Sequence, residues 1–137
     1  MPLRLETKTR ARALQMLYAW EMQGQPPMEL ASELPGEFPL RPRDRMRAER
    51  LATSVASELR GLDEEIAAAA ANWRFERIGA VEKNILRLGL HEIRTGDVPA
   101  AVAIDEAVKL AHWFAGPKAP GFVNGVLDAL ARRLGRL

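Results

Sequence analysis

The apolar residues of this chain recur mostly at intervals of three and four positions, which is the spacing of one face of an α-helix. The first such stripe consists of Leu14, Leu17, Tyr18 and Met22. It predicts a helix over about residues 8–23, after a short arm at residues 1–6. Thr7 or Thr9 is expected to cap this helix, and Gly24 to end it in the left-handed conformation that glycine tolerates.

Six further helices follow from similar stripes and from the proline, glycine and aspartate residues near their ends. Their expected ranges are about 28–33, 43–60, 63–73, 80–94, 99–115 and 122–134. Gly61 is expected to end the third helix of the chain, and Asp63 to cap the fourth. No segment alternates apolar and polar residues over the length of a useful strand. The predicted fold class is therefore all-α, with about seven helices in two helical subdomains over about residues 1–61 and 62–137.

The fifth of these helices has an unusually wide apolar arc. One face carries Val81, Ile85 and Leu88, and a second carries Leu86, Leu90 and Ile93. An arc of that width predicts a central, largely buried helix. Glu92 continues the first face, so its carboxylate is expected to be at least partly buried and to have a structural partner.

The composition is that of one soluble globular domain, with 137 residues, 47% of them hydrophobic and 28% charged. The formal charge is only +2, so the location of the charged residues says more about partners than their total does. The chain has no cysteine, which excludes disulfides and thiol chemistry. No apolar run is long enough to cross a bilayer and the N-terminus is unlike a signal peptide, so a cytoplasmic protein is expected.

Catalysis, metal binding and cofactor binding find little support in the sequence. The two histidines, His91 and His112, are far apart, and no dense cluster of metal ligands appears. Carboxylates are scattered, no Ser/His/Asp set can be assembled, and there is no glycine-rich phosphate loop. We therefore expect no catalytic residues, no metal ion and no cofactor.

A basic cluster lies at the start of the first predicted helix. Lys8, Arg10 and Arg12 fall within two helical turns, and Arg4 is near. Such a cluster supplies the donors and positive charge that phosphate oxygens need. Composition alone nevertheless favours a solvated helix end over a nucleic-acid site.

Two aromatic residues and one polar helix face are further candidates. Tyr18 and Phe122 fit apolar stripes, which favours a place in the core for both rings. Phe122, however, follows a Gly/Pro loop, and an exposed ring beside basic residues can stack on unpaired bases. Glu82, Lys83 and Arg87 lie on the less apolar side of the fifth helix, where a solvated face with ordinary ion pairs is the simpler interpretation.

A set of stretches covers nearly the whole chain in order: RARALQMLYAWE, LDEEI, NW, VEKNILRLGLHEI, VPAAVAIDEAVKLA and FVNGVLD. Together they resemble the NusB family of bacterial transcription antitermination factors. Any one stretch is a weak signal, and the most specific is FVNGVLD with the preceding IDEAVKLA. The set of stretches in this order is a strong signal.

The resemblance implies an all-α fold of two helical subdomains, a single RNA-binding domain and no catalysis. It implies binding to the boxA element in the leader RNA of ribosomal operons, together with NusE, a protein of the small ribosomal subunit. The pair would help RNA polymerase read through terminators. Some members of the family self-associate, so the resemblance also allows a homodimer.

The resemblance further implies a set of RNA-binding residues: Lys8, Arg10, Arg12, Tyr18, Glu82, Arg87, Lys118 and Phe122. Basic side chains would hold phosphates, rings would stack on bases, and Glu82 would accept hydrogen bonds from base amino groups. Lys118 stands where some members carry an acidic residue, and its positive charge should favour RNA. The arm before the first helix is less basic than in many members, and His91 replaces a commoner aromatic residue.

Two other functions remain open at this point. One is a helical protein-interaction module whose basic face meets an acidic protein. The other is an isolated NusB-like domain related to rRNA cytosine methyltransferases, in which such a domain precedes the catalytic one. The chain ends at Leu137 without a cofactor-binding domain, which favours the antitermination factor.

Overall fold

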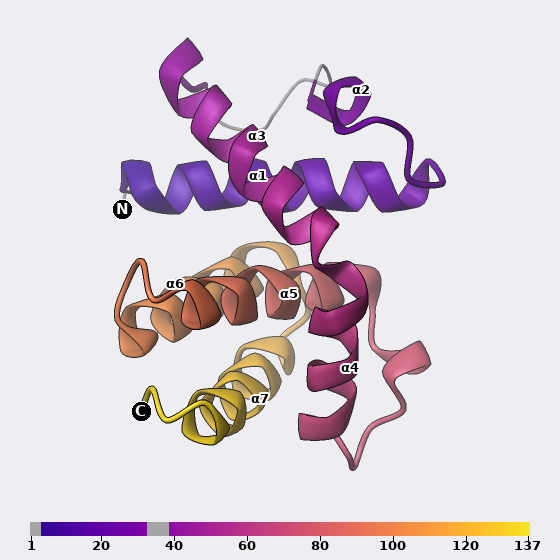
Figure 1. The fold of residues 1–137 in the computed structure, drawn as a ribbon, viewed down its shortest axis with the longest axis vertical. Coiled ribbons are helices and arrows are strands. Elements are labelled where there is room, and N and C mark those ends of the chain that lie inside the picture. The colour runs from indigo at the N-terminus through magenta and orange to yellow at the C-terminus, as the bar shows by residue number, and fades with distance from the viewer. Residues whose placement is uncertain (1–3, 33–38) are drawn as a thin grey trace. The chain divides into compact units, whose positions relative to one another are not determined.

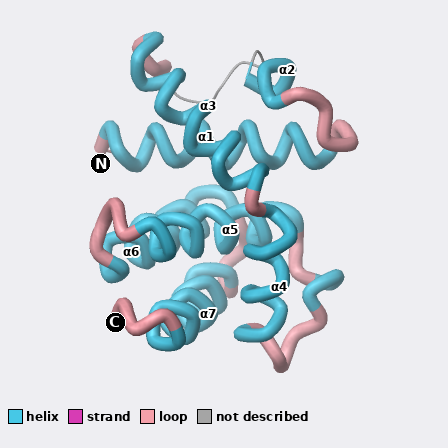
Figure 2. The backbone as a smooth tube through the Cα atoms, viewed as in Figure 1, coloured by secondary structure: helices cyan, strands magenta, loops and turns pink. Residues whose placement is uncertain are grey.

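The computed structural model describes residues 4–32 and 39–137. Every regular element in these ranges is helical, with seven α-helices and one 3₁₀ turn, so the predicted all-α class is confirmed (Figure 1 and Figure 2). The chain divides into two compact units, Met1–Ser57 and Glu58–Leu137. No helix of the described residues is long and apolar enough to cross a membrane.

The first unit contains α1 (Leu5–Met22), α2 (Met28–Ser32) and α3 (Pro42–Ser57), and each of the three contacts the other two. Figure 1 shows α3 crossing α1. The core residues of α3 are mostly small, namely Ala48, Ala52 and Val55. Small side chains let two helix backbones approach closely, which suits the extensive contact between α1 and α3.

The first helix differs from its prediction at its start. It begins at Leu5, so the two last residues of the expected arm are helical, and residues 1–3 lie outside the described ranges. Neither threonine caps it, because both lie inside the helix. The Thr9 hydroxyl donates a hydrogen bond of 2.9 Å to the Leu5 carbonyl. Arg4 is the N-cap residue instead. The predicted end is confirmed, since Gly24 has a φ of +81°.

The apolar stripe of α1 was predicted only in part. Leu14 and Leu17 are buried, whereas Tyr18 and Met22 are exposed. Met16 and Trp20 are buried as well, so the buried residues are spread around the helix and do not form one narrow stripe.

The second unit contains α4 (Leu59–Ala69), the 3₁₀ turn η1 (Phe75–Arg77), α5 (Ala80–Thr95), α6 (Ala100–Phe114) and α7 (Ala119–Arg133). Within it α5 contacts α4, α6 and α7, and α7 likewise contacts the other three helices. The buried residues of α5 include Ile85, Leu86, Leu88, Leu90 and Ile93, as the wide apolar arc predicts. Glu92 is buried too, which confirms that expectation.

Two helix starts in this unit differ from their predictions. The fourth helix begins at Leu59, so Gly61 and Asp63 lie inside it, and Asp63 is not its cap. The seventh begins at Ala119, three residues before the expected start at Phe122. Pro120 is tolerated there because the amide hydrogens of a first helical turn have no partner within the helix.

Candidate nucleic-acid interface

A pocket of about 940 Å³ opens on the second unit, where the connector between α4 and α5 meets the start of α7. Its lining residues are Asn72, Trp73, Arg74, Arg77, Ile78, Gly79, Glu82, Gly116, Pro117, Lys118, Ala119 and Phe122. The lining thus combines three cationic side chains, two large aromatic rings and one carboxylate. That mixture suits a ligand that carries negative charge, a flat ring and polar edge groups.

Three residues of the predicted site lie together in this pocket. Glu82 lies in the first turn of α5, Lys118 immediately precedes α7, and Phe122 follows one turn into α7. Lys118 is exposed and Phe122 is half-buried, so the ring is not simply part of the core, where its apolar stripe placed it. Two chain segments that are far apart in sequence therefore supply one surface.

The carboxylate of Glu82 is held close to the backbone at the start of α5. A Cβ atom placed on Gly79 would lie 2.6 Å from Glu82 Oε2, so this side chain occupies the space that a larger residue would fill. Carboxylates are favoured at helix N-termini, where the helix dipole is positive. Gly79 therefore permits a close approach that keeps the carboxylate on the pocket wall.

Trp73 forms a ring pair with Phe122. The ring centroids are 5.1 Å apart and the planes meet at 68°, an edge-to-face arrangement. Trp73 is 60% exposed, which is unusual for the largest apolar side chain. The pair therefore presents an aromatic surface to solvent at the edge of the pocket.

The connector that carries the pocket's arginines is anchored at the start of η1 and just after its end. Lys83 Nζ lies 4.6 Å from the centroid of the Phe75 ring, a cation–π contact between η1 and α5. Ile78 is buried after the turn. Arg74 and Arg77 remain exposed on the pocket wall. Lys83 thus has a packing role, and its face of α5 is not merely solvated.

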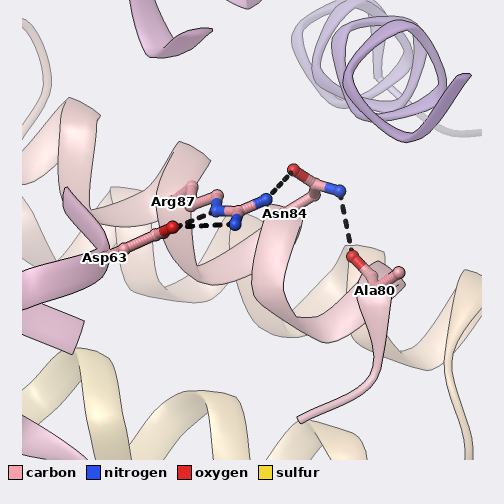
Figure 3. Close-up of polar contacts among 4 residues, drawn as sticks. All are labelled: Asp63, Ala80, Asn84 and Arg87. Carbon is pink, nitrogen blue, oxygen red and sulfur yellow. Dashed lines mark hydrogen bonds and ion pairs between the residues drawn. The ribbon is translucent and has the colours of Figure 1, made fainter. Parts of the chain in front are cut away.

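Arg87 does not join this pocket, although it was predicted as an RNA contact and as part of a solvated face. It is 2% exposed, and its Nε and Nη2 donate to the two carboxylate oxygens of Asp63 at 2.7 and 2.9 Å (Figure 3). Its Nη1 donates to Asn84 Oδ1 at 2.9 Å, and Asn84 Nδ2 donates to the Ala80 carbonyl at 2.9 Å. This network joins α4 to α5, so the structure gives Arg87 a structural role.

The basic turn of the predicted site lies in the first unit. Arg10 and Arg12 are only 8% and 5% exposed, and Lys8 is half-buried. Burial lowers the pKa of the Arg12 guanidinium, and the positive charge of Arg45 lowers it further. Arg4 and Lys8 are therefore the cations of this turn that solvent reaches best.

Tyr18 also lies in the first unit, and its ring is 41% exposed. The apolar stripe favoured the core for this ring, and that interpretation was wrong. Its exposure leaves the ring able to stack on a base, as the family resemblance implies. Tyr18 and Lys8 thus belong to one unit, and Glu82, Lys118 and Phe122 to the other.

Sequence reasoning missed three residues of the pocket, Trp73, Arg74 and Arg77. A usable signal was present, because a tryptophan flanked by arginine follows the alanine-rich end of the fourth helix.

In residues 4–32 and 39–137, no group of three or more His, Cys, Asp or Glu side chains could hold a metal ion. The pocket supplies positive charge, stacking surface and a hydrogen-bond acceptor, which are means of binding.

The helical fold and the basic, aromatic pocket are of a kind that suits an RNA-binding protein. The model of the NusB family matches residues 7–132. The transcription antitermination protein NusB of Sorangium cellulosum is 42% identical over 129 residues, which cover 93% of this chain and 92% of that protein. The chain therefore belongs to the NusB family, and it is a non-enzymatic transcription antitermination factor.

Solved structures agree with this assignment. The structure of T. maritima NusB matches with a TM-score of 0.81 and 25% identity, covering 96% of this chain and 93% of that one. A chain in the crystal structure of antitermination factors NusB and NusE in complex with dsRNA matches with a TM-score of 0.78 and 27% identity. That match covers 96% of this chain and 99% of the other.

Proposed function

We propose that this protein binds boxA-type leader RNA of ribosomal operons together with NusE, and that the pair acts on RNA polymerase as part of an antitermination complex. The observation that carries the proposal is the pocket, which gathers Glu82, Lys118 and Phe122 from two distant chain segments. A structural relative described in complex with NusE and dsRNA supports NusE as the partner and RNA as the ligand. We place this activity in the bacterial cytoplasm, where leader RNA is transcribed.

Each part of the pocket matches one part of a single-stranded nucleotide. Lys118 and the arginines of the connector supply charge for phosphate oxygens. Phe122 offers a ring for stacking, and the Glu82 carboxylate can accept hydrogen bonds from a base amino group. Stacking tolerates every base, so the carboxylate supplies the sequence preference. Lys8 and Tyr18 on the first unit would add a phosphate contact and a second stacking ring.

Fluorescence titration of a labelled boxA-like RNA, with and without purified NusE, tests this function directly. We expect the protein alone to bind weakly, because few phosphate contacts are available, and to bind more tightly with NusE. The affinity should fall as salt rises, because the contacts that exist are to phosphates. A scrambled RNA of the same length and composition is the control at matched salt. Equal affinity for the boxA-like and scrambled RNAs in the presence of NusE would contradict the proposal. Size-exclusion chromatography at the same concentrations shows whether the RNA meets a monomer or a homodimer.

A further inference from the structure

We propose that Trp73 stacks on a base of the bound RNA. This inference rests on the RNA-binding function proposed above. A tryptophan that only completed the packing around Phe122 would gain by burying its ring, yet Trp73 is 60% exposed. An exposed aromatic surface bordered by polar and charged residues is the usual mark of a binding site.

The geometry of the ring pair favours one base on Trp73. With an interplanar angle of 68°, the two rings cannot enclose a base between parallel faces. Phe122 instead braces Trp73 in an edge-to-face contact with centroids 5.1 Å apart. A braced ring loses little conformational freedom when a base stacks on it, which lowers the cost of binding.

The charges beside Trp73 indicate a nucleotide and not an apolar peptide. Arg74 is its chain neighbour, and Arg77 and Lys118 line the same pocket, all three with exposed side chains. A phosphate on the side of this pocket would therefore have cations near it. Arginine beside an aromatic ring also adds cation–π stabilisation to a stacked base.

A second hollow indicates how the strand continues past the ring pair. It has a volume of about 280 Å³ and is also lined by Trp73 and Phe122. Its other lining residues are small or polar: Ala69, Ala70, Ala71, Asn72, Gly121, Gly125 and Val126. The ring pair thus lies where two hollows meet, and a strand that stacks one base on Trp73 has room for its neighbouring nucleotide on each side.

Replacing the ring gives the first test. Trp73→Leu should weaken binding of the boxA-like RNA in the presence of NusE by between about 5-fold and 100-fold, because one stacked base is lost. The dependence of affinity on salt should stay unchanged, because no charge is removed. Trp73→Phe should retain most of the affinity. The matched control is Trp113→Leu, since Trp113 is 55% exposed on α6 and lies outside both hollows.

Abasic RNA identifies the stacked base and separates stacking from a structural effect. At one boxA position, removal of the base should weaken the wild-type complex, and Trp73→Leu should cause no further loss with that RNA. A structural role would give the same loss with every RNA, and thermal unfolding would show it as a lower melting temperature. In a Trp113→Phe background, RNA binding should quench the fluorescence of Trp73, which is then the exposed tryptophan of the described chain.

The outcomes separate this inference from the function on which it rests. If the wild type prefers boxA-like over scrambled RNA while Trp73→Leu binds as tightly as Trp113→Leu, the inference is wrong and the function stands. If boxA-like and scrambled RNAs bind equally, yet both quench Trp73 and depend on it, the function is wrong and the stacking residue stands. Loss of NusE binding by Trp73→Leu with unchanged RNA binding would assign the ring to the protein partner and overturn the inference.

Discussion

At the scale of single residues, the ion pair between Asp63 and Arg87 is a short, two-bond contact that joins α4 to α5. Both donor–acceptor distances are below 3.0 Å, the geometry is bidentate, and the Arg87 side chain is almost fully buried. A buried charge loses its hydration, so it is tolerated only while its partners remain. Loss of either partner should therefore lower the free energy of unfolding.

We expect Asp63→Ala to lower the free energy of unfolding by about 3 kcal/mol, because it leaves the Arg87 guanidinium buried without its carboxylate. Urea unfolding followed by circular dichroism measures the effect. The matched control is Asp105→Ala, which removes the exposed partner of Lys109 and should change stability by less than about 0.5 kcal/mol. Both variants share the gain in helix propensity from alanine, so their difference isolates the buried pair.

The same pair decides between a structural and an RNA-binding role for Arg87. The double variant Asp63→Ala/Arg87→Met should recover part of the lost stability, since it also removes the buried charge that Asp63 had paired with. If this double variant folds and also binds RNA with a lower salt dependence than the wild type, Arg87 contacts phosphate after all.

At the scale of helices, the packing of α5 depends on a glycine in its middle. A Cβ atom on Gly89 would lie 2.7 Å from Leu127 Cδ1 on α7 and 3.5 Å from Ala107 Cβ on α6. Leu127 is fully buried, so its side chain has no solvent into which it could turn. Gly89 thus sets how closely α5 packs against α6 and α7, at the cost of the lower helix propensity of glycine.

Gly89→Ala should therefore destabilise the protein by roughly 1 kcal/mol, the balance of an overpacking cost of about 1–3 kcal/mol and a propensity gain near 1 kcal/mol. The matched control is Gly125→Ala on α7, where the added Cβ would meet nothing within 4 Å. That variant should be more stable than the wild type by about 0.5–1 kcal/mol. A stabilising effect at both positions, measured by chemical unfolding, would show that Leu127 can move aside.

Helix existence could be predicted from the sequence, whereas several helix ends could not. Periodic apolar residues specify a helix along its whole length, which is why the buried arc of α5 was predicted. Asp63 was expected to cap α4 because aspartate is a good cap. In the structure its carboxylate binds Arg87, a partner 24 residues away, and α4 begins a turn earlier. Local pattern gives no information about such a distant partner.

The candidate site, too, could be predicted from the sequence only in part. The family resemblance named Glu82, Lys118 and Phe122, and the structure brings them into one pocket. The exposure of Trp73 was not predictable, because it depends on how the connector after α4 packs against α5 and α7. The burial of Arg87 was not predictable either. The helical period places its side chain on one face of α5, but it does not show that a carboxylate of α4 packs against that face.

At the scale of the whole molecule, charge is distributed unevenly over the two units. Met1–Ser57 contains nine Lys or Arg and seven Asp or Glu residues, whereas Glu58–Leu137 contains eleven of each. The formal charge of +2 therefore comes from the first unit alone. With so small a total, long-range attraction to RNA is weak, and salt dependence must come from cations in direct contact with phosphates.

RNA titrations at several salt concentrations can therefore distinguish the contributions of the two units to binding. Lys8→Gln in the first unit should lower the salt slope of boxA binding by about one, the effect of losing one phosphate contact. Phe122→Leu in the second unit should weaken binding and leave the slope unchanged, because it removes a ring and no charge. The control is Lys109→Gln, whose ammonium already pairs with Asp105 at 3.2 Å and should leave both affinity and slope unaltered.

The double variant Lys8→Gln/Phe122→Leu completes the test. If both units contact the same RNA through independent groups, the two losses of binding free energy should add, since each variant removes a contact that the other leaves intact. An unchanged slope in Lys8→Gln would instead make the basic turn of α1 a solvated helix end, which is what composition alone favours. A lower melting temperature in Phe122→Leu with normal RNA affinity would assign that ring to the core, and Trp73 would then be the stacking ring of the pocket.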